Sequence, residues 1–322
     1  MNPKRTIGYK ACPYQSYHSE LALIEHFRHS KYATKNPNNA SIFLVPNYSA
    51  CFYNQCLSSN VTTPHMCRYQ AEEYIRNILS YIEESKPYWT RNEGQDHVFV
   101  FAWDTATALF KNDPHLLTRL HNTIHLTHHA ARDSIYFKPK RDISIPCHRL
   151  IEFERKDFRK TKKTIKAYFR GAILKNPQYS LEIRQKLKSM YGNAPGFFIN
   201  DQHSEFYIHE MVKSKYSLCP PGWAEWSPRF YDALQLESIP VLFEKKWTLP
   251  FADIIDYSRI SFVCPDIKLP KCLQEHDGYY NIYIKQVTAV KHLLDYISDG
   301  FNALDMIARE LSIRQTGSKL NK

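Results

Sequence analysis

The stretch CPPGWAEWSPRFYDALQLESIPV, residues 219–241, decides the fold of this chain. A Pro-Pro-Gly turn follows directly after the strand end at 217–219, and a second apolar run closes the stretch. Between them, Ser227 and Pro228 form a typical helix start, because serine favours the N-cap and proline the first helical position. The stretch therefore predicts a strand, a tight turn, a helix and another strand, the rhythm of a parallel sheet.

The predicted helix start carries residues suited to binding a nucleotide. A helix N-terminus at the carboxyl end of a strand presents unpaired N–H groups and a positive dipole end to a phosphate. Arg229 can bind phosphate oxygens, and Asp232, on the same helix face, can accept from two ribose hydroxyls. Trp223 or Trp226 can cover a base or a sugar face. The same spacing also fits a surface ion pair with both tryptophans in the core, so the residues alone leave both interpretations open.

Composition places the chain among folded globular proteins. Its 322 residues, 43% of them hydrophobic, suffice for two domains or one large α/β unit. The net charge of +11 indicates an anionic partner. Because this charge concentrates in ERKDFRKTKKTIK, residues 154–166, and no RNA or DNA motif occurs, we do not expect nucleic acid as the partner. The absence of GxGxxG and P-loop motifs disfavours dinucleotide-fingerprint and P-loop sites.

The eight cysteines bear on the redox compartment and on metal binding. None forms a CxxC pair, so the usual spacing of a structural zinc site is missing. Cys51, Cys56 and Cys67 cluster in sequence, and an oxidising compartment would pair two of them. Buried free thiols are the equal alternative.

Signals for targeting are weak. The N-terminus has no apolar h-region and no window reaches about 18 consecutive apolar residues, so the chain as written is predicted to be soluble, without a signal or transmembrane segment. Three sequons fit a protein of the secretory pathway, at Asn39, Asn47 and Asn60.

Strands and helices alternate over both halves of the chain. Apolar runs at 41–46 and 97–102 predict buried parallel strands, with an amphipathic helix at about 68–84 between them, and the second half repeats this rhythm. We predict an α/β fold with two doubly wound domains facing across a cleft. The predicted parts are residues 1–153, a basic linker at 154–166, and residues 167–322, whose last helix, from Tyr283 to Leu311, breaks and crosses back to the first domain.

Five segments, in a fixed order, resemble the exostosin family of glycosyltransferases. The longest is SKYSLCPPGWAEWSPRFYDALQLESIPVLFEKKWTLPFADIIDYSRISF, residues 214–262. The others are YATKNPNNASIFLVPNY (32–48), PYWTRNEGQDHVFVFAWD (87–104), RDISIP (141–146) and YFRGA (168–172) followed by Ile183-Arg184. Together they cover most of the chain between residues 32 and 262.

The resemblance implies a GT-B architecture of two Rossmann-like domains, an N-terminal one for the acceptor and a C-terminal one for the nucleotide sugar. It implies transfer of a sugar, with inversion, from a nucleotide donor, usually a UDP-sugar, to a glycan or polysaccharide acceptor. No cofactor is expected beyond this substrate, and no metal, because no DxD triplet occurs. A homo- or hetero-oligomer with another glycosyltransferase is a further expectation. The expected location is the Golgi lumen if a membrane anchor is missing from this sequence.

The resemblance also assigns donor-binding residues. Arg229 would neutralise the diphosphate, Asp232 would hold the ribose hydroxyls, and Ser227 with the helix amides would complete a phosphate cradle. The full predicted donor set is Arg170, Arg184, Gly222, Ser227, Arg229 and Asp232.

Inversion requires one general base for the acceptor hydroxyl. The candidates are Asp96 and His97, at the start of a predicted strand, and Asp104, at its carboxyl end. Strand direction favours Asp104, because sites in such sheets form at carboxyl ends. The alternative is that Asp96 caps a turn and His97 packs in the core.

The chain also departs from the family pattern. Pro221 and Ile173 lie where many members have a basic residue, and each lost cation costs about 1.5–3 kcal/mol of binding if it is not replaced. Arg170, Lys175 or Arg184 are the predicted replacements. The alternative function is therefore a non-catalytic exostosin-like protein that binds a glycan or a partner glycosyltransferase.

Overall fold

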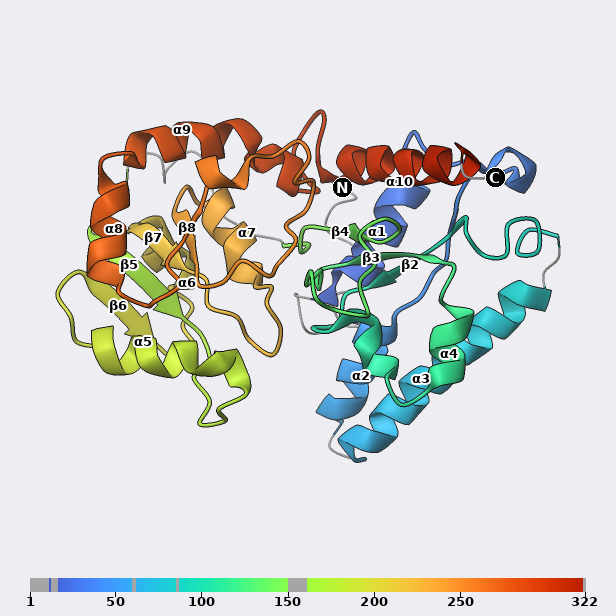
Figure 1. Cartoon of the computed structure of the whole chain (residues 1–322), viewed down its shortest axis with the longest axis horizontal. Helices are drawn as coiled ribbons and strands as arrows, with labels where there is room; N and C mark the ends of the chain where they lie inside the picture. Colours follow the sequence, from blue (N-terminus) through green and yellow to red (C-terminus); the bar gives the residue numbers. More distant parts are fainter. Residues whose placement is uncertain (1–11, 13–16, 60–61, 85–86, 150–160, 321–322) are drawn as a thin grey trace. The chain divides into compact units, whose positions relative to one another are not determined.

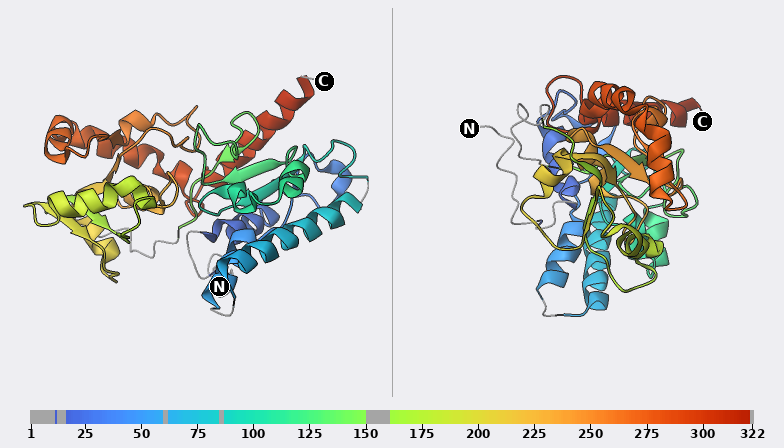
Figure 2. Two further views of the ribbon diagram at one scale, coloured as in Figure 1. Left: turned by 60° about the horizontal axis from the view of Figure 1, so that its bottom comes forward. Right: turned by 90° about the vertical axis from the view of Figure 1, so that its left-hand side faces the viewer.

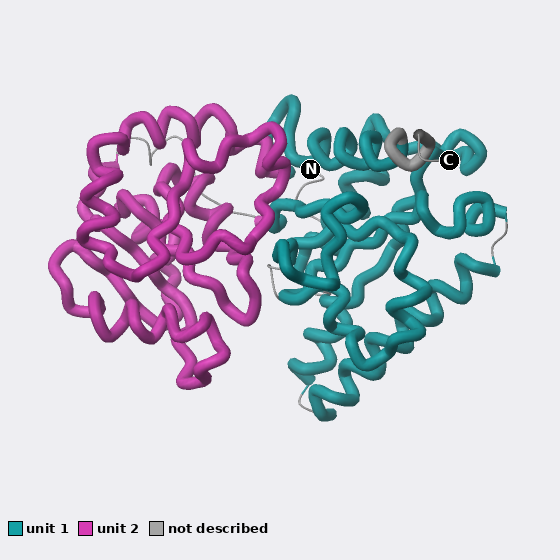
Figure 3. The backbone as a smooth tube through the Cα atoms, in the orientation of Figure 1, with its two compact units in different colours: residues 1–148, 296–322 teal, residues 149–295 magenta. Residues whose placement is uncertain are grey.

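The computed structural model describes residue 12 and residues 17–59, 62–84, 87–149 and 161–320. Contacts divide the chain into two compact units, residues 1–148 with 296–322, and residues 149–295 (Figure 3). Each unit is built on a parallel β-sheet.

The sheet of the first unit runs in chain order, β1-β2-β3-β4, with all described pairs parallel. Its strands are β1 (Phe43–Leu44), β2 (His97–Phe101), β3 (Ile124–Thr127) and β4 (Ile143–Ser144). The helices are α1 (Ser19–Arg28), η3 (Pro37–Asn39), α2 (Ser49–Ser58), α3 (Pro64–Glu84), η4 (Ala106–Phe110), α4 (Pro114–Arg119) and α10 (Ala303–Leu320) (Figure 1).

Helix α3 covers one face of this sheet because its apolar residues recur at helical spacing. Ala71, Ile75 and Leu79 are fully buried against Phe99 and Phe101 of β2. α10 lies on the opposite side from α3, where it packs against α1 and β4 (Figure 2, left). β2 is therefore buried on both faces, as its unbroken apolar run HVFVF requires.

The sheet of the second unit has the order β6-β5-β7-β8-β9, again parallel. Its strands are β5 (Ile165–Arg170), β6 (Phe197–Asn200), β7 (Ser214–Leu218), β8 (Ile239–Leu242) and β9 (Phe262–Val263). Its helices are η6 (Tyr179–Glu182), α5 (Ile183–Tyr191), α6 (Tyr207–Val212), α7 (Pro228–Gln235), η7 (Tyr257–Arg259), α8 (Leu269–Asp277), α9 (Tyr280–Val290) and η8 (Lys291–Leu294). The direction of winding reverses between β5 and β7, which makes this a doubly wound sheet with a topological switch point there.

Helices cover both faces of the second sheet. α5, α8 and α9 pack on one face through Leu187, Leu273 and Tyr283. α6 and α7 pack on the other, where Met211 and Ala233 lie in one cluster with Tyr168 of β5. The α/β fold predicted from the sequence is confirmed, with the two parallel-sheet units of a GT-B protein. The prediction of a doubly wound sheet in each unit holds for the second sheet, whereas the described strands of the first sheet run in chain order without a reversal.

The structure corrects the predicted domain bounds. β5 begins at Ile165, so the last two residues of the predicted linker belong to a strand, while residues 154–160 lie outside the described part of the chain. Residues 296–322 belong to the first unit because α10 packs there. The predicted break in the last helix is confirmed: α9 continues directly into η8, and an irregular segment at 295–302 leads to α10, which returns to the first unit. The cleft between the domains stays a prediction.

Three disulfides cross-link the chain: Cys12–Cys51, Cys56–Cys67 and Cys264–Cys272. Cys147 and Cys219 are buried and belong to none of these three disulfides. Of the two interpretations of the cysteine cluster, the structure agrees with the oxidised one, since each of its three members is paired.

Removal of the disulfides is expected to destabilise the chain in the order of the loops that they close. The separations are 39 residues for Cys12–Cys51 and 8 for Cys264–Cys272. Loop-closure entropy then predicts a loss of about 4 kcal/mol for a Cys12→Ser/Cys51→Ser variant and about 2.5 kcal/mol for Cys264→Ser/Cys272→Ser. Urea unfolding of the two variants measures both values. Equal stability of variants and wild type would show that the thiols are not paired in solution.

Two further features concern the compartment. Asn47 is fully buried, and its side chain bonds both the backbone O and N of Val100 at 2.7 and 3.1 Å, so its sequon is inaccessible in the folded protein. Asn39 is exposed, and Asn60 lies outside the described residues. Among the helices that the structure describes, none is long and apolar enough to span a bilayer.

Candidate functional site

The candidate site lies at the switch point of the second sheet. Gly171 follows the carboxyl end of β5, and Cys219 to Gly222 follow the carboxyl end of the neighbouring strand β7. α7 then begins at Pro228. Ligands of open α/β sheets bind at such a point, so the stretch that predicted the fold also forms the expected ligand edge.

Arg229 is the central side chain of this edge. Its guanidinium lies 4.5 Å from the centroid of the Phe169 ring, while Nη2 donates to the Arg170 carbonyl at 2.7 Å and Nη1 to Ser227 Oγ at 3.3 Å. Nε is buried and has no hydrogen-bond partner among the described residues. A buried charged donor without a partner is costly, so this N–H is suited to an anionic ligand.

Gly171 makes room for the guanidinium of Arg229. A Cβ atom at this position would lie 2.5 Å from Arg229 Nη2, closer than real Cβ contacts. The glycine therefore allows the close approach of the Arg229 guanidinium to the end of β5, and its role does not depend on a positive φ angle.

Helix α7 begins where the sequence predicted, but the N-cap side chain does not form a hydrogen bond to the helix. Ser227 is the N-cap residue and Pro228 the first helical residue, yet the serine side chain does not cap the helix. It accepts from Arg229 instead. The start of the helix therefore lacks a side-chain cap, and the Arg229 guanidinium lies next to its N-cap residue, an arrangement that favours an anion.

Both carboxylate oxygens of Asp232 already accept hydrogen bonds from side chains of the protein. Its oxygens accept from Arg149 Nε at 2.8 Å and Nη2 at 3.1 Å, and from the Tyr207 hydroxyl at 2.9 Å. Burial and the neighbouring carboxylate raise the pKa of the Tyr207 phenol well above 10, so this hydroxyl remains a donor. Ribose hydroxyls would have to replace these partners, and neither Arg149 nor Tyr207 was predicted from the sequence.

Arg184 braces the loops around Gly222. It donates to the Pro221 carbonyl at 2.9 Å, to the Ala172 carbonyl at 3.0 Å and to the Tyr179 hydroxyl. Its predicted contact with the donor has no support in this geometry, because the guanidinium is used to hold the Pro-Pro-Gly turn. Gly222 lies close to the Arg184 guanidinium, since a Cβ atom at residue 222 would be 3.4 Å from Arg184 Nη2.

Arg170 is likewise committed to protein partners. Its guanidinium forms a bidentate pair with Glu210, at 2.7 and 2.6 Å, and also donates to the Gln202 carbonyl. Of the three cations proposed to replace those missing at Pro221 and Ile173, Lys175 is the exposed one. Arg170 thus contributes to the edge through its carbonyl, which holds Arg229.

The two tryptophans of the opening stretch differ in exposure. Trp223 is 53% exposed and packs edge-on against Tyr179 at 5.0 Å, whereas Trp226 is only 5% exposed. Trp223 is therefore the one of the pair that can cover a base or a sugar.

Asp96 and His97 lie at the amino end of β2, away from the carboxyl edge where sites form. Asp96 accepts from Arg91, Asn92 and His97 at 2.6–2.8 Å. Burial alone would raise the pKa of Asp96, but these hydrogen bonds lower it to about 2. The arrangement agrees with the alternative of a structural turn, and a carboxylate held in this way is a weak base.

Asp104 lies three residues beyond the carboxyl end of β2. It is half-buried and accepts from the Tyr17 hydroxyl at 2.9 Å. Of the three predicted bases it alone lies at the carboxyl edge of its sheet.

A model of the exostosin GT47 domain matches residues 2–275. The chain belongs to the exostosin GT47 family. Two relatives illustrate its place in this family. "Probable glucuronosyltransferase Os03g0107900" from Oryza sativa subsp. japonica is 27% identical over 266 residues, covering 78% of this chain and 60% of the relative. "Probable glucuronosyltransferase 47 A" from Physcomitrium patens is 28% identical over 275 residues, covering 78% of this chain and 58% of the relative. The chain thus spans about 60% of the length of these relatives.

Similar solved structures include the GtfA/B complex, with a TM-score of 0.40 and 7% identity over 76% of this chain and 61% of that chain. TarM has a TM-score of 0.36 and 9% identity over 73% of this chain and 57% of that chain. At these values the likeness supports no detail of the site.

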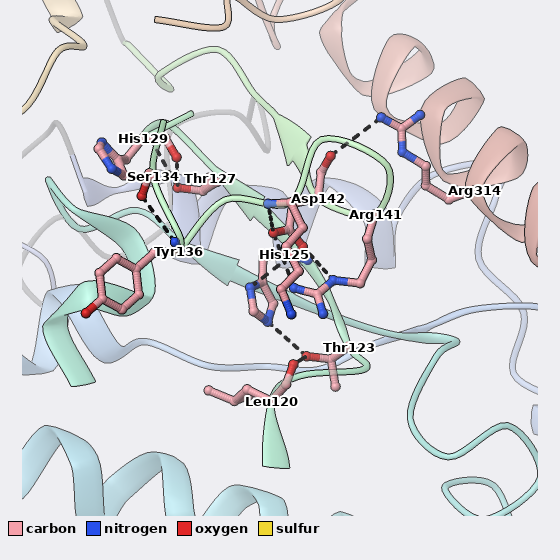
Figure 4. Close-up of polar contacts among 11 residues, drawn as sticks. Leu120, Thr123, His125, Thr127, His129, Ser134, Tyr136, Arg141, Asp142 and Arg314 are labelled. Atoms are coloured by element: carbon pink, nitrogen blue, oxygen red, sulfur yellow. Dashed lines mark hydrogen bonds and ion pairs between the residues drawn. The ribbon is translucent and has the colours of Figure 1, made fainter. Parts of the chain in front are cut away.

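The amino edge of the first sheet holds a structural polar network (Figure 4). Asp142 accepts from the backbone N–H groups of His125 and Lys138 and from the Arg141 guanidinium at 2.8–3.3 Å, and Arg314 of α10 donates to its carbonyl. Burial lowers the pKa of His125 to about 4, against the opposing effect of Asp142. The network therefore fastens β3 to β4 and α10 and is turned away from the carboxyl edge. No group of three or more His, Cys, Asp or Glu within the described ranges is placed to hold a metal ion.

Glu20 at the carboxyl edge of the first sheet was missed by the sequence analysis. It is fully buried and accepts from Ser49 Oγ and from the backbone N–H groups of Ala50, Cys51 and Ala102 at 2.9–3.4 Å. It thereby joins α1 to the start of α2 and the end of β2. No local pattern shows this, because its partners lie 29–82 positions away.

Glu20 is expected to make stability fall as pH rises from about 5 to 8. Burial raises its pKa from 4.5 to about 8, although hydrogen bonds from the backbone lower it in part. The folded protein then holds a proton that the unfolded chain releases, so the contribution to stability is present below about 4.5 and is lost as pH rises through about 8. The expected slope is about 1 kcal/mol per pH unit. The free energy of unfolding of the wild type and of Glu20→Gln is measured at several pH values, and the difference between the two proteins gives this slope. A difference that stays the same at every pH would contradict the prediction.

Proposed function

We propose that the chain is an inverting, metal-independent glycosyltransferase that moves a sugar from a nucleotide donor to a glycan or polysaccharide acceptor. UDP is the proposed nucleotide. Glucuronic acid is the first donor sugar to test, because the two relatives described above are named glucuronosyltransferases.

The observation that carries the proposal is the unpartnered Nε of Arg229 at the switch point of the second sheet. The guanidinium is fixed on Phe169 and Arg170 and lies beside the uncapped start of α7. This edge of the sheet holds its positive charge in place before the reaction. Such fixed charge stabilises a diphosphate leaving group, because negative charge grows on the diphosphate as the bond breaks.

In the proposed reaction an acceptor hydroxyl oxygen attacks the anomeric carbon of the donor sugar as the bond from that carbon to the diphosphate oxygen breaks. The bonding electrons pass to the diphosphate, whose growing charge is met by Arg229 and the N–H groups of α7. Asp104 is the proposed base that takes the hydroxyl proton. The ribose hydroxyls replace Arg149 and Tyr207 as donors to the Asp232 carboxylate.

The test is release of UDP from a panel of UDP-sugars with a glycan acceptor, with and without EDTA. Equal release under both conditions, lost in Asp104→Asn, supports the proposal. Release that requires an added divalent cation would contradict metal independence, and an unaffected Asp104→Asn would remove that residue as the base. The anomeric configuration of the product, measured by NMR, tests inversion.

A second candidate, a non-catalytic exostosin protein, is favoured by one observation. Arg170 and Arg184 are both committed to protein partners, so neither replaces the cations missing at Pro221 and Ile173. UDP binding in a thermal-shift assay, without turnover of any donor, is the outcome that would support this candidate over the enzyme.

The Golgi lumen is the proposed location, supported by the three disulfides, which persist in oxidising compartments. Protease protection of the expressed protein in intact membranes tests it. Digestion without detergent would place the chain on the cytosolic side.

Assembly into a homo- or hetero-oligomer with another glycosyltransferase is also part of the proposal. Light scattering of the purified chain measures self-association, and co-purification with a second exostosin protein tests the mixed assembly. A monomer in both experiments would contradict it.

A further inference from the structure

The N-glycosylation sequons differ in exposure. Asn39, in Asn39-Ala40-Ser41, ends the short helix η3, and both Asn39 and Ser41 are exposed. Asn47 is fully buried, and its side chain bonds the backbone O and N of Val100 at 2.7 and 3.1 Å. A glycan on the Asn47 amide would not fit the close-packed core, so a chain modified there could not reach this fold. Asn39 is therefore a sequon that the folded protein can carry in glycosylated form.

Contacts of the finished fold do not hinder modification of Asn39, because N-glycans are attached to the growing chain. The Ser41 carbonyl accepts from Gln315 Nε2 at 2.8 Å, and the two residues are 274 positions apart. At about 5–20 residues per second, synthesis of this interval takes at least about 10 s. The sequon is therefore not yet held by α10 when it first becomes accessible.

A cavity of about 1030 Å³ lies beside Asn39, which is one of its lining residues. Its walls are the end of α1, the loop 31–42 and α10, all within the first unit. Figure 1 shows this loop, in blue, near the C-terminal part of α10. Tyr32 and Phe301 line the cavity with rings that are 44 and 52% exposed, and such rings offer flat apolar surface to the C–H faces of sugars. The cavity has room for more than one sugar residue.

The charged groups of the lining favour an uncharged occupant. Three of the four lining cations pair with carboxylates: Arg28 with Glu25 at 3.1 Å, Lys31 with Asp305 at 2.9 Å and Arg309 with Glu310 at 2.6 Å. Because a carboxylate lies beside each of these cations, the lining attracts an anion only weakly. The first sugars of an N-linked glycan are N-acetylhexosamines, which carry no charge and match such a lining.

We propose that Asn39 carries an N-linked glycan whose first sugars pack in this cavity against the rings of Tyr32 and Phe301. In the modification, Asn39 Nδ2 forms a bond to C1 of a sugar carried on a lipid pyrophosphate and loses one proton. The bond from C1 to the phosphate oxygen breaks, and the lipid pyrophosphate leaves with the bonding electrons. The inference goes beyond the proposed reaction and rests on the proposed secretory location, which the three disulfides support.

The first test expresses the whole chain in eukaryotic cells behind a cleavable signal peptide and recovers the folded protein. After enzymatic removal of N-glycans, peptide mass spectrometry should find residue 39 converted to aspartate and Asn47 unchanged. Asn39→Gln and Ser41→Ala should each abolish the modification. Thr62→Ala, which deletes only the sequon at Asn60, is the matched control and should leave Asn39 modified. An unmodified Asn39, or a glycan on Asn47 of the folded protein, would overturn the inference.

The second test measures how fast a peptide N-glycosidase releases the glycan from Asn39. Release from the folded protein should be at least about tenfold slower than from the denatured protein, because the packed sugars must first leave the cavity. Phe301→Ala should speed release from the folded protein about fivefold. Tyr32→Phe, which keeps the ring, should release at the wild-type rate.

Tyr81→Ala is the matched control for the aromatic change, since Tyr81 is 74% exposed in the same unit and lies outside the cavity lining. Its release rate should equal that of the wild type. Equal rates for folded and denatured protein, or an unchanged rate in Phe301→Ala, would overturn the packing of the glycan in the cavity. Neither test uses the donor edge, so failure of the proposed reaction would change neither result, and the added signal peptide makes both independent of the natural location.

Discussion

Replacement of Arg229 by alanine is expected to lower kcat/KM for the nucleotide sugar about 100- to 1,000-fold, the range for loss of one fixed donor to a developing charge. The side chain is 8% exposed and its guanidinium is held by Phe169, Arg170 and Ser227, so its buried, unpartnered Nε–H is oriented before the ligand arrives. Most of the loss should appear in kcat, because the diphosphate gains charge as the glycosidic bond breaks.

Two variants interpret the result. Arg229→Lys keeps the positive charge but lacks the planar guanidinium, which can bond the Arg170 carbonyl and the ligand at the same time. This variant should therefore have only part of the wild-type activity. Arg259→Ala makes the same chemical change on an exposed arginine of the same unit and should have wild-type activity. Unfolding curves of all three separate catalysis from stability. An Arg229→Ala enzyme with normal turnover and normal folding would disprove the assignment of the donor edge.

The stretch at residues 219–241 predicted both the parallel sheet and the ligand edge because all its signals are local. A strand, a turn, a proline at the helix start and an arginine in the first turn follow one another along the chain. The N-cap hydrogen bond was not predictable, because Ser227 serves Arg229, whose direction is set by Phe169 and Arg170 of another strand.

The remaining candidates show where sequence reasoning stops. An arginine suits a phosphate and a protein carbonyl equally well, and only tertiary contacts reveal that Arg184 binds carbonyls 12 and 37 positions away and that Arg170 pairs with Glu210. Arg149 on Asp232 is separated from it by 83 positions. The place of Asp96 could be predicted from the sequence alone, because Asp96 precedes the predicted strand and therefore lies at the amino edge of the sheet.

Replacement of Gly171 by alanine is expected to reduce kcat/KM by about 100-fold while the protein still folds. The new methyl group would lie 2.5 Å from Arg229 Nη2, and the guanidinium, at the end of a flexible side chain, must move away from the Arg170 carbonyl. A displacement of about 1 Å in a positioning group is enough for a loss of this size.

A double-mutant cycle shows whether this loss passes through Arg229. If it does, Gly171→Ala in an Arg229→Ala background should cost almost nothing further, because the group that the methyl displaces is already absent. Gly278→Ala is the matched control, since a Cβ there meets nothing within 4 Å. Additive losses in the cycle would mean that Gly171 serves the site in another way, for example through its own N–H, which donates to the Asn200 carbonyl at 3.0 Å. A non-additive cycle would instead establish that the glycine after β5 is retained to keep the fork of Arg229 aimed at the donor.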